Sequence, residues 1–377
     1  MPARVLVVFG TRPEAVKLAP VVQALVADPS FTPLVAVTAQ HRDLLDQILE
    51  LFRIEPDYDL DLMRPGQDLY HVTSAALLGL KPVLADAAPD LVVVQGDTTT
   101  TFVGALAAFY ERIPVAHVEA GLRTGDPFAP YPEETNRALT ARLANYHFAP
   151  TDLAHENLVR EGIDPRAITV TGNTGVDALL QVAERVRLTP PALPRPLRDL
   201  DPKRRLVLVT AHRRESFNGG MERICRAVAE LARRRPELDI VFPVHPNPNV
   251  RAAVDATLAD TKNVRVVEPV DYEQLVWLLT RAHLVLTDSG GIQEEAPSLN
   301  VPALVLRDKT ERPEGVETGA LKLVGTNPTR IVGEALRLLD DETEHARMAA
   351  APNPYGDGRA AERIRAVLAR ELLREAA

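Results

Sequence analysis

Three acidic positions in the first half of the chain stand where proton chemistry is expected. Asp97 follows the apolar run Leu91–Val94 after only two residues, and Glu119 ends the next apolar segment, PVAHVE. Glu133 and its neighbour Glu134 follow a loop rich in proline and glycine. Each could be structural, since Asp caps helices and acids stabilise a first helical turn. Carboxyl groups that converge without a cysteine or histidine cluster are typical of proton transfer, with a Mg²⁺ site as the alternative.

A second group of residues has the composition of an anion-binding site. The segment LTDSGGIQEEAPS places Ser289, Gly290 and Gly291 where a strand passes into a helix, and TAHRRES places His212 at another strand end. Glycines let backbone N–H groups approach a phosphate closely, and the helix N-terminus adds a favourable dipole. Glu295, one turn into this helix, could accept hydrogen bonds from both hydroxyls of a ribose. Ser-Gly-Gly could also be a plain turn.

The first expected strand-to-helix turn, FGTRPEAVK, offers Arg12 and Lys17 to an anion in the same way. It matches neither the GxGxxG fingerprint nor a P-loop, so a dinucleotide site is poorly supported. Carboxyl groups in the first half and an anion pocket in the second predict a nucleotide joined to a group that needs acid–base chemistry.

The elements that must position these residues alternate along the sequence. Short β-branched runs such as RVLVVFG, LVVVQGD and LVLTDSGG are typical of buried parallel strands, and the stretches between them have helical periodicity. This alternation predicts βαβ units and an α/β fold of two doubly wound Rossmann-like domains facing a cleft. Ligands of such sheets bind outside the carboxyl ends of the strands.

The alternation stops at the proline-rich segment RVRLTPPALPRPLRDLDPKRR, residues 185–205. We interpret it as a linker with no regular element. The expected boundaries are 1–185 for a domain with the acid/base residues, 186–204 for the linker, 205–357 for a nucleotide-binding domain, and 358–377 for a C-terminal helix.

Composition narrows the class of protein. The 377 residues carry a formal net charge of -9, which leaves no basic surplus for the phosphates of nucleic acid. The single cysteine, Cys225, excludes a disulfide framework and a cysteine-based metal site. The N-terminal residues have no signal-peptide pattern, and no apolar run approaches the roughly 18 residues of a membrane span. We therefore expect a cytoplasmic protein that binds neither nucleic acid nor a membrane.

A series of short motifs along nearly the whole chain resembles those of the non-hydrolysing UDP-N-acetylglucosamine 2-epimerases of bacteria. The motifs are FGTRPE, QHR, QGDTTTT, HVEAGLRTGD, PEETNR, TGNT, TAHRRE, PVHPNP, LTDSGGIQEEAPSL, RDKTERPEG and NPYGDG. The resemblance implies the GT-B fold, a C-terminal helix that packs back on the first domain, and a homodimer. It implies no cofactor and no metal.

The resemblance also implies the reaction, which inverts C2 of the sugar and gives UDP-N-acetylmannosamine, a precursor of bacterial cell-surface polysaccharide. UDP would leave in an elimination that removes the C2 proton and yields a 2-acetamidoglucal. UDP would then add back as a proton reaches the opposite face of C2. Two acid/base groups are needed, because one group cannot reach both faces.

Matched motif by motif, the family's acid/base residues correspond to Asp97, Glu119 and Glu133, and its essential histidine near the diphosphate corresponds to His212. Which carboxyl group serves which face of C2 stays open. The family's contacts with UDP or phosphate correspond to Arg12, Lys17, Ser289, Gly290, Gly291, Glu295 and Arg312, and Val270 and Leu275 fall where the family frames uracil.

Bacterial members of the family often bind a second UDP-N-acetylglucosamine molecule as an activator. The chain keeps residues that would contact it, namely Gln40, His41, Arg213 and His245. Asp43 and Gly66 stand where other members have Gln and Arg. The resemblance therefore leaves allosteric activation open.

Three alternative functions remain. A hydrolysing 2-epimerase would release free N-acetylmannosamine, but the full-length bacterial pattern without a kinase domain argues against it. A GT-B glycosyltransferase would suit the Ser-Gly-Gly pocket, but three convergent carboxyl groups would be surplus. A UDP-sugar sensor without activity would have replaced acids, and none of the three is replaced.

Overall fold

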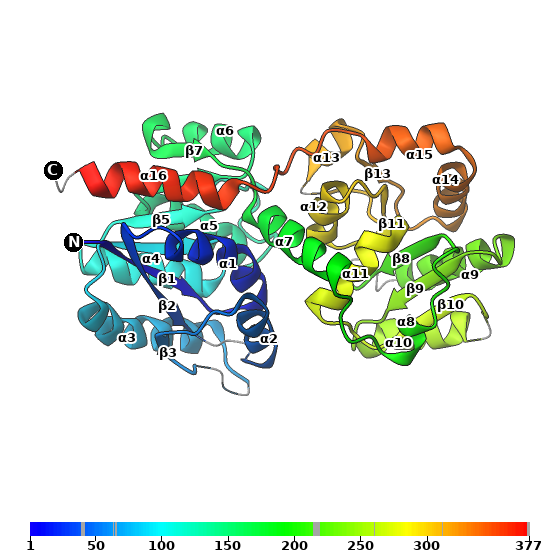
Figure 1. The fold of residues 1–377 in the computed structure, drawn as a ribbon, viewed down its shortest axis with the longest axis horizontal. Coiled ribbons are helices and arrows are strands. Elements are labelled where there is room, and N and C mark those ends of the chain that lie inside the picture. The colour runs from blue at the N-terminus through cyan, green and yellow to red at the C-terminus, as the bar shows by residue number, and fades with distance from the viewer. Residues whose placement is uncertain are drawn as a thin grey trace. The chain divides into compact units, whose positions relative to one another are not determined.

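In the computed structural model, the described residues are 1–38, 42–62, 64, 66–213, 219–259, 261–310 and 312–374. The chain divides into two compact units, one of Met1–Ala178 with Gly356–Ala377 and the other of Leu179–Tyr355. The division falls within helix α7 (Thr174–Leu188). Each unit holds a parallel sheet with helices on its faces (Figure 1).

The first unit contains a parallel sheet in the order β3-β2-β1-β4-β5-β6-β7. This order reverses between β1 and β4, the kind of switch point at which α/β sheets bind ligands. The strands are β1 (Ala3–Phe9), β2 (Phe31–Val37), β3 (Tyr58–Asp59), β4 (Leu91–Gln95), β5 (Val115–Val118), β6 (Tyr146–Ala149) and β7 (Ile168–Val170). The helices are α1 (Arg12–Val26), α2 (Arg42–Phe52), α3 (Leu69–Ala87), α4 (Thr99–Tyr110), α5 (Glu133–Leu143), α6 (Asp152–Arg160), the short η1 (Pro165–Ala167) and α16 (Ala360–Arg374).

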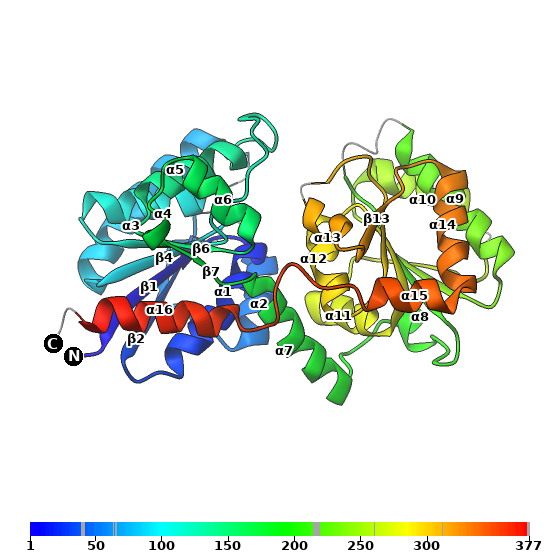
Figure 2. The ribbon, with the colours of Figure 1, turned by 90° about the horizontal axis from the view of Figure 1, so that it is seen from above.

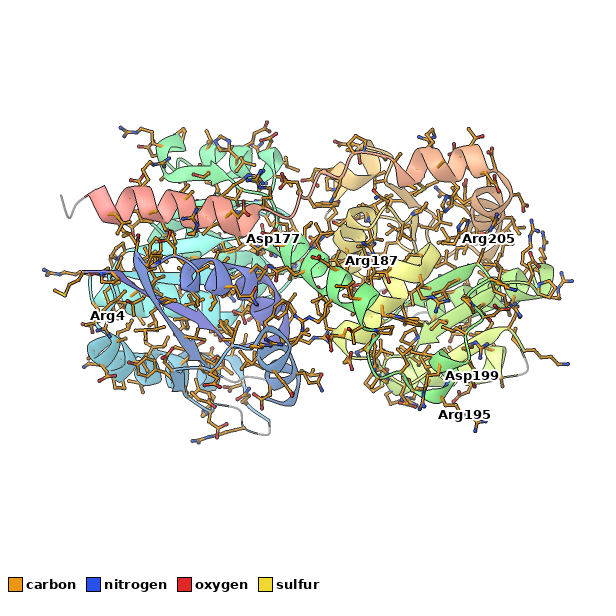
Figure 3. The ribbon with its side chains drawn as sticks, viewed as in Figure 1. Arg4, Asp177, Arg187, Arg195, Asp199 and Arg205 are labelled. Carbon is orange, nitrogen blue, oxygen red and sulfur yellow. The ribbon has the colours of Figure 1, made fainter. Side chains whose placement is uncertain are left out.

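The central strands of this sheet are covered on both faces, which is why β4 is apolar from Leu91 to Val94 and buried throughout. Helices α3, α4 and α5 lie on one face, and α1 and α16 pack together on the other (Figure 2). The carboxyl group of buried Asp177, labelled in Figure 3, fixes the start of α16. It accepts hydrogen bonds from the N–H groups of Ala360 at 3.2 Å and Ala361 at 2.8 Å. The predicted return of the C-terminal helix to the first domain is confirmed.

The second unit contains a parallel sheet in the order β10-β9-β8-β11-β12-β13, with the order reversing between β8 and β11. Its strands are β8 (Leu206–Thr210), β9 (Asp239–Pro243), β10 (Val264–Val267), β11 (Ala282–Thr287), β12 (Ala303–Val305) and β13 (Leu321–Leu323). Its helices are α8 (Arg195–Arg198), α9 (Gly220–Arg234), α10 (Pro248–Leu258), α11 (Tyr272–Arg281), α12 (Gly290–Ser298), α13 (Pro313–Glu317), α14 (Pro328–Asp340) and α15 (Glu342–Ala349).

Helix α9 illustrates how the sequence covers this second sheet. Its apolar residues Ile224, Cys225, Val228 and Leu231 recur at helical spacing and are all buried in one core cluster with α10 and α14. Cys225 is a core residue, as its spacing predicted, and burial raises the pKa of its thiol to about 12.

The proline-rich segment 185–205 differs from the expectation of an irregular linker. Helix α7 continues to Leu188, and α8 forms one turn over Arg195–Arg198. Proline is compatible with α8 because Pro196 lies in its first turn, where no intrahelical N–H is needed. The predicted α/β class with two parallel sheets is confirmed.

Candidate functional site

The carboxyl ends of β1, β4 and β5 lie side by side at one edge of the first sheet, because these strands are parallel neighbours. Asp97 lies in the turn between β4 and α4, and Glu119 directly follows β5. Lys17 lies on α1, the helix that follows β1. The sheet thus brings together three residues that are far apart in the sequence.

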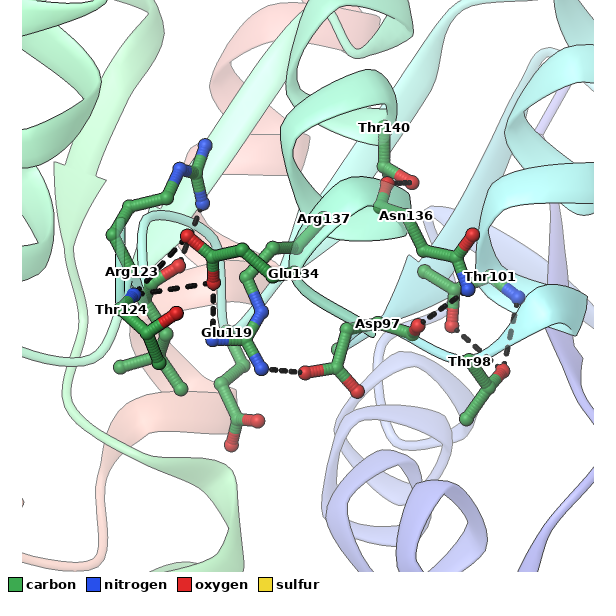
Figure 4. Close-up of polar contacts among 12 residues, drawn as sticks. Asp97, Thr98, Thr101, Glu119, Arg123, Thr124, Glu134, Asn136, Arg137 and Thr140 are labelled. Atoms are coloured by element: carbon green, nitrogen blue, oxygen red, sulfur yellow. Dashed lines mark hydrogen bonds and ion pairs between the residues drawn. The ribbon is translucent and has the colours of Figure 1, made fainter. Parts of the chain in front are cut away.

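Asp97 is held by two consecutive residues of α5, Asn136 and Arg137. Arg137 Nη2 forms an ion pair with Asp97 Oδ2, and Asn136 Nδ2 donates to the Asp97 carbonyl oxygen at 3.0 Å (Figure 4). The Asp97 side chain is 25% exposed, so its carboxyl group remains accessible from solvent.

Glu119 is held by Lys17, whose Nζ forms an ion pair with Glu119 Oε2. The two side chains are only 9% and 18% exposed, respectively. Glu119 also has a φ of +63°, in the left-handed region that costs a non-glycine residue about 1–2 kcal/mol. Such backbone strain is concentrated at functional sites. Lys17 therefore contacts a candidate acid, whereas the motif match had grouped it with the phosphate contacts.

Glu133 and Glu134 have different environments at the start of α5. Glu134 is buried and accepts from the N–H groups of Thr124 at 3.1 Å and Gly125 at 3.0 Å, and Arg137 Nη1 lies 3.2 Å from its Oε2. Glu133 Oε2 is buried without a hydrogen-bond partner among the described residues. Glu134 is thus held by two backbone N–H groups and Arg137, whereas Oε2 of Glu133 has no described partner.

The threonines after Asp97 serve a carboxyl group that the sequence analysis missed. Glu14 is 1% exposed, and its Oε1 accepts from the hydroxyls of Thr98 at 2.7 Å and Thr101 at 3.1 Å. Its Oε2 accepts from the N–H groups of Gly10 at 3.1 Å and Thr11 at 2.8 Å. Burial raises the pKa of Glu14 in spite of these donors. The capping-box pattern Thr-x-x-Glu in TRPE is a sequence signal that could have identified it.

The turn between β1 and α1 packs closely against Thr38 and Thr100, which explains why position 10 is a glycine. A Cβ at this position would lie 2.1 Å from Thr38 Oγ1 and 2.6 Å from Thr100 Oγ1, and these two hydroxyls are 2.9 Å apart. Any larger side chain would push the β1–α1 turn away from the turn that carries Asp97.

His117 is a second buried residue that the sequence analysis missed. It lies within β5, two residues before Glu119, and its Nε2 is 2.7 Å from the carbonyl oxygen of Gly96. Burial lowers the pKa of His117 to about 3, so the ring is neutral and donates through Nε2. This bond ties the strand that ends at Glu119 to the turn that carries Asp97.

In the second unit, His212 lies at the switch point, two residues after the end of β8. Buried Asp288, after β11, accepts from the N–H groups of His212 at 2.9 Å and Arg213 at 2.9 Å. His212 Nδ1 lies 3.5 Å from Asp288 Oδ1, and the ring stacks on His245 with centroids 5.5 Å apart. Asp288 therefore orients both the backbone and the ring of His212.

The N-terminus of α12 is surrounded by guanidinium groups. A Cβ on Gly290 would lie 3.1 Å from Arg312 Nη1 and 3.4 Å from Arg213 Nη2, whereas one on Gly291 would meet no atom within 4 Å. Ser289 is the N-cap residue, and its side chain makes no capping hydrogen bond. Arg213 Nε is buried without a hydrogen-bond partner among the described residues. Arg312 Nε also donates to Glu294 Oε1 at 2.8 Å, so one of the two guanidinium groups is ion-paired. Guanidinium groups at a helix N-terminus are a combination that favours an anion.

The remaining candidates are placed as follows. Glu295 lies on α12, Leu275 on α11 and Val270 just before α11, all half-buried, and Arg12 is exposed at the first residue of α1. Gln40 and His41 lie outside the described residues.

Among the described ranges, no group of three or more His, Cys, Asp and Glu side chains is arranged to hold a metal ion. In the same ranges, every helix is too short or too polar to cross a membrane.

Similarity to known proteins agrees with this geometry. The profile of the family described as UDP-N-acetylglucosamine 2-epimerase matches residues 23–369. The chain is 57% identical over 364 residues to the UDP-N-acetylglucosamine 2-epimerase of Yersinia pestis, covering 96% of this chain and 97% of the relative. It is 56% identical over 364 residues to the enzyme of that name from Escherichia coli strain K12, with 96% and 97% covered.

Solved structures extend the similarity to three dimensions. The UDP-GlcNAc 2-epimerase of Neisseria meningitidis bound to UDP-GlcNAc has a TM-score of 0.89 and 45% identity, covering 98% of this chain and 100% of that one. The Methanocaldococcus jannaschii UDP-GlcNAc 2-epimerase in complex with UDP-GlcNAc and UDP has a TM-score of 0.79 and 36% identity, with 97% and 99% covered. The chain therefore belongs to the UDP-N-acetylglucosamine 2-epimerase family, in its non-hydrolysing bacterial branch.

Proposed function

We propose that the protein catalyses the reversible conversion of UDP-N-acetylglucosamine into UDP-N-acetylmannosamine. The observation that carries the proposal is the position of Asp97 and Glu119 at the ends of adjacent strands. Each carboxyl group is paired with a cation, Arg137 or Lys17. Paired carboxylates at one sheet edge can exchange protons with a single sugar carbon from more than one direction.

In the first half-reaction, one carboxylate takes the proton from C2. The electron pair of the C2–H bond becomes the C1=C2 double bond of a 2-acetamidoglucal, and UDP leaves with the electrons of the C1–O bond. The C2 proton is weakly acidic, so the base must lie within hydrogen-bond reach of it. Asp97, Glu119 and Glu133 are the candidates, and the uncommitted oxygen of Glu133 supports its inclusion.

In the second half-reaction, a phosphate oxygen of UDP attacks C1, and a second carboxyl group delivers a proton to the opposite face of C2. The proton count balances, because one group has gained a proton and another has lost one. The two groups regain their starting forms by exchange with solvent or with each other.

UDP is expected to bind the second unit. Its diphosphate would meet the N-terminus of α12, with Ser289, Gly290 and Gly291, and the guanidinium group of Arg312. Negative charge grows on the leaving phosphate as the C1–O bond breaks, so positive charge there stabilises the transition state. His212 Nδ1 lies 3.5 Å from Asp288 Oδ1, and we expect Nε2 to be the ring nitrogen that donates to the leaving oxygen.

The other contacts are carried over as part of the same proposal. Glu295 would bind the ribose, Val270 and Leu275 would frame the uracil, and Arg12 would contact a phosphate. Since Arg213 lies beside Gly290, it would serve the diphosphate as well as any second substrate molecule bound near His245.

We also infer a cytoplasmic homodimer that supplies a precursor for cell-surface polysaccharide. Large apolar side chains are exposed on the neighbouring helices α3 and α4, including Tyr70 at 86%, Leu78 at 72% and Tyr110 at 62%. Exposed apolar patches of this kind mark protein interfaces. Light scattering should give a dimer for the wild type and a monomer for Leu78→Glu, and a monomeric wild type would refute the inference.

Proton NMR of the protein with UDP-N-acetylglucosamine in D₂O tests the reaction. UDP-N-acetylmannosamine with deuterium at C2 is expected. Free N-acetylmannosamine with UDP would instead establish hydrolysis, and an unchanged substrate would refute epimerisation.

A further inference from the structure

Arg137 is the residue that joins two carboxyl groups of different character. Its Nη2 pairs with Asp97, and its Nη1 lies 3.2 Å from Glu134 Oε2. The Arg137 side chain is 11% exposed, Glu134 is 7% exposed and Asp97 is 25% exposed. The most accessible member of the trio is therefore the candidate acid, and the guanidinium group lies between its carboxyl group and that of Glu134 (Figure 4).

The helix that carries Arg137 holds Asp97 in two ways. Asn136, the preceding residue, donates to the Asp97 carbonyl oxygen at 3.0 Å, while Arg137 binds the carboxyl group. The same helix begins with Glu133. Because Glu133 and Arg137 are four residues apart, about one turn of α5 fixes the position of Asp97 relative to a second candidate acid.

Glu134 in turn fixes the guanidinium group. Its carboxylate accepts from the N–H groups of Thr124 and Gly125 at 3.0–3.1 Å, so it is anchored to the loop that follows Glu119. In any proton-transfer cycle Asp97 must pass between a charged and a neutral form. Because Glu134 stays beside Arg137 throughout, the guanidinium group keeps a counter-ion when Asp97 is neutral.

We propose that Arg137 is a positioning residue for proton transfer at C2. It aims the Asp97 carboxyl group and offsets its charge, while Glu134 holds the guanidinium group in place. This inference rests on the proposed epimerase function and assigns it two residues, Arg137 and Glu134, that the motif match gave no role.

The alternative is an ion pair that only stabilises the fold, and a burial-matched control distinguishes the two. Arg123 is 10% exposed and pairs with Glu161 through Nε at 2.6 Å, but it has no described contact with Asp97, Glu119 or Glu133. Arg137→Gln and Arg123→Gln each remove one buried guanidinium group from the same unit. We would measure kcat, KM, UDP affinity and thermal unfolding for both, together with Arg137→Lys, Glu134→Gln and Arg137→Gln/Glu134→Gln.

For Arg137→Gln we expect kcat to fall about 100-fold, the lower end of what a well-placed acid or base contributes. KM and the affinity for UDP should change less than about threefold, because ground-state binding is retained. The kcat of Arg137→Lys should lie between those of Arg137→Gln and the wild type. Lysine keeps the positive charge but lacks the planar guanidinium group that can donate to two carboxyl groups at once. The kcat of Glu134→Gln should be about tenfold lower than that of the wild type. The kcat of the double variant should be no lower than that of Arg137→Gln, as expected for residues that act as a unit. Arg123→Gln should lower the unfolding temperature with kcat within about threefold of wild type.

Either of two results would overturn the inference. One is a folded Arg137→Gln protein with kcat within about threefold of wild type. The other is equal loss of kcat in Arg137→Gln and Arg123→Gln at equal loss of thermal stability. A wild-type protein that exchanges no C2 proton would refute the epimerase function itself, and these variants with it.

Discussion

Lys17 and Glu119 form an ion pair across 102 residues of sequence. The pair joins α1 to the residue that follows β5. The positive charge of Lys17 therefore contacts the side chain of Glu119, whose backbone is strained at a φ of +63°. A motif match places Lys17 among phosphate contacts, but the structure places its amine against a carboxylate of the first unit.

The first prediction concerns this pair. Glu119→Gln should lower kcat by about 100-fold or more, because an amide cannot exchange the C2 proton. Lys17→Met should also lower kcat, since Glu119 would lose the cation that orients it. Both are measured by NMR of the epimerisation in D₂O. Lys81→Met, an exposed lysine on α3, is the control and should leave kcat unchanged; an active Glu119→Gln protein would exclude Glu119 as an acid or base.

The second prediction separates two adjacent acids. Glu133→Gln should lower kcat about 100-fold with little change in stability, because Glu133 Oε2 has no hydrogen-bond partner among the described residues. Glu134→Gln should lower the free energy of unfolding by about 1–3 kcal/mol, since its carboxylate holds two backbone N–H groups and Arg137. Urea unfolding and kcat together test this, and the reverse pattern would exchange the roles of the two residues.

The third prediction concerns the anion site of the second unit. Gly290→Ala adds a Cβ only 3.1 Å from the Arg312 guanidinium group, so that group must shift. We expect the affinity for UDP to fall about tenfold, equal to 1.4 kcal/mol of lost phosphate contact. Calorimetric titration with UDP measures this.

Gly333 provides the matched glycine control for that experiment. It is exposed on α14, and an added Cβ would meet no atom within 4 Å. Gly333→Ala should leave UDP binding unchanged and raise stability by about 0.5–1 kcal/mol. Equal UDP affinities in Gly290→Ala and wild type would mean that the diphosphate binds elsewhere.

The fourth prediction concerns stability against acid. Burial lowers the pKa of His147 to about 4 from its ordinary 6.5, so the folded state keeps the ring neutral while the unfolded chain takes up a proton. Unfolding therefore binds a proton between pH 6.5 and 4, and the free energy of unfolding falls as pH falls through this window. Between pH 7 and 5 this histidine should account for about 1–2 kcal/mol of the loss.

Urea unfolding of wild type and His147→Gln at both pH values checks this prediction. The loss between pH 7 and 5 should be smaller in the variant, since glutamine does not titrate. The burial of His117, whose pKa is lowered to about 3, contributes a loss of the same sign in both proteins. An identical loss in wild type and His147→Gln would show that His147 is accessible to protons in the folded state.

Much of the fold could be predicted because it depends on local pattern. Runs such as Leu91–Val94 are apolar along their length, as expected for a strand covered on both faces, and they lie in strands of parallel sheets. The helix over residues 195–198 was not predicted, since a one-turn helix is too short for any periodicity to be read. The two-residue strand Tyr58–Asp59 was missed for the same reason.

The site could be predicted only in part. Asp97, Glu119 and Glu133 were identifiable because each stands beside a strand end or a helix start in a distinctive motif. Arg137 was not, since nothing in its helix indicates that its partner is a carboxyl group 40 residues earlier. His117 looks like any polar residue in a strand until burial and the 2.7 Å contact with Gly96 are known.

The sequence by itself determined the residue types, their order, the alternation of strands and helices, and hence the α/β class and the family. Only the tertiary structure decided which charges compensate one another. Lys17 forms an ion pair with Glu119, and Arg137 forms ion pairs with both Asp97 and Glu134. Within the described part of the chain, Oε2 of Glu133 has no hydrogen-bond partner. The reason is physical: side-chain pairing depends on distances of a few ångströms between segments that are remote in sequence. Those distances are fixed by strand order and helix packing, which the spacing of residues along one chain does not encode.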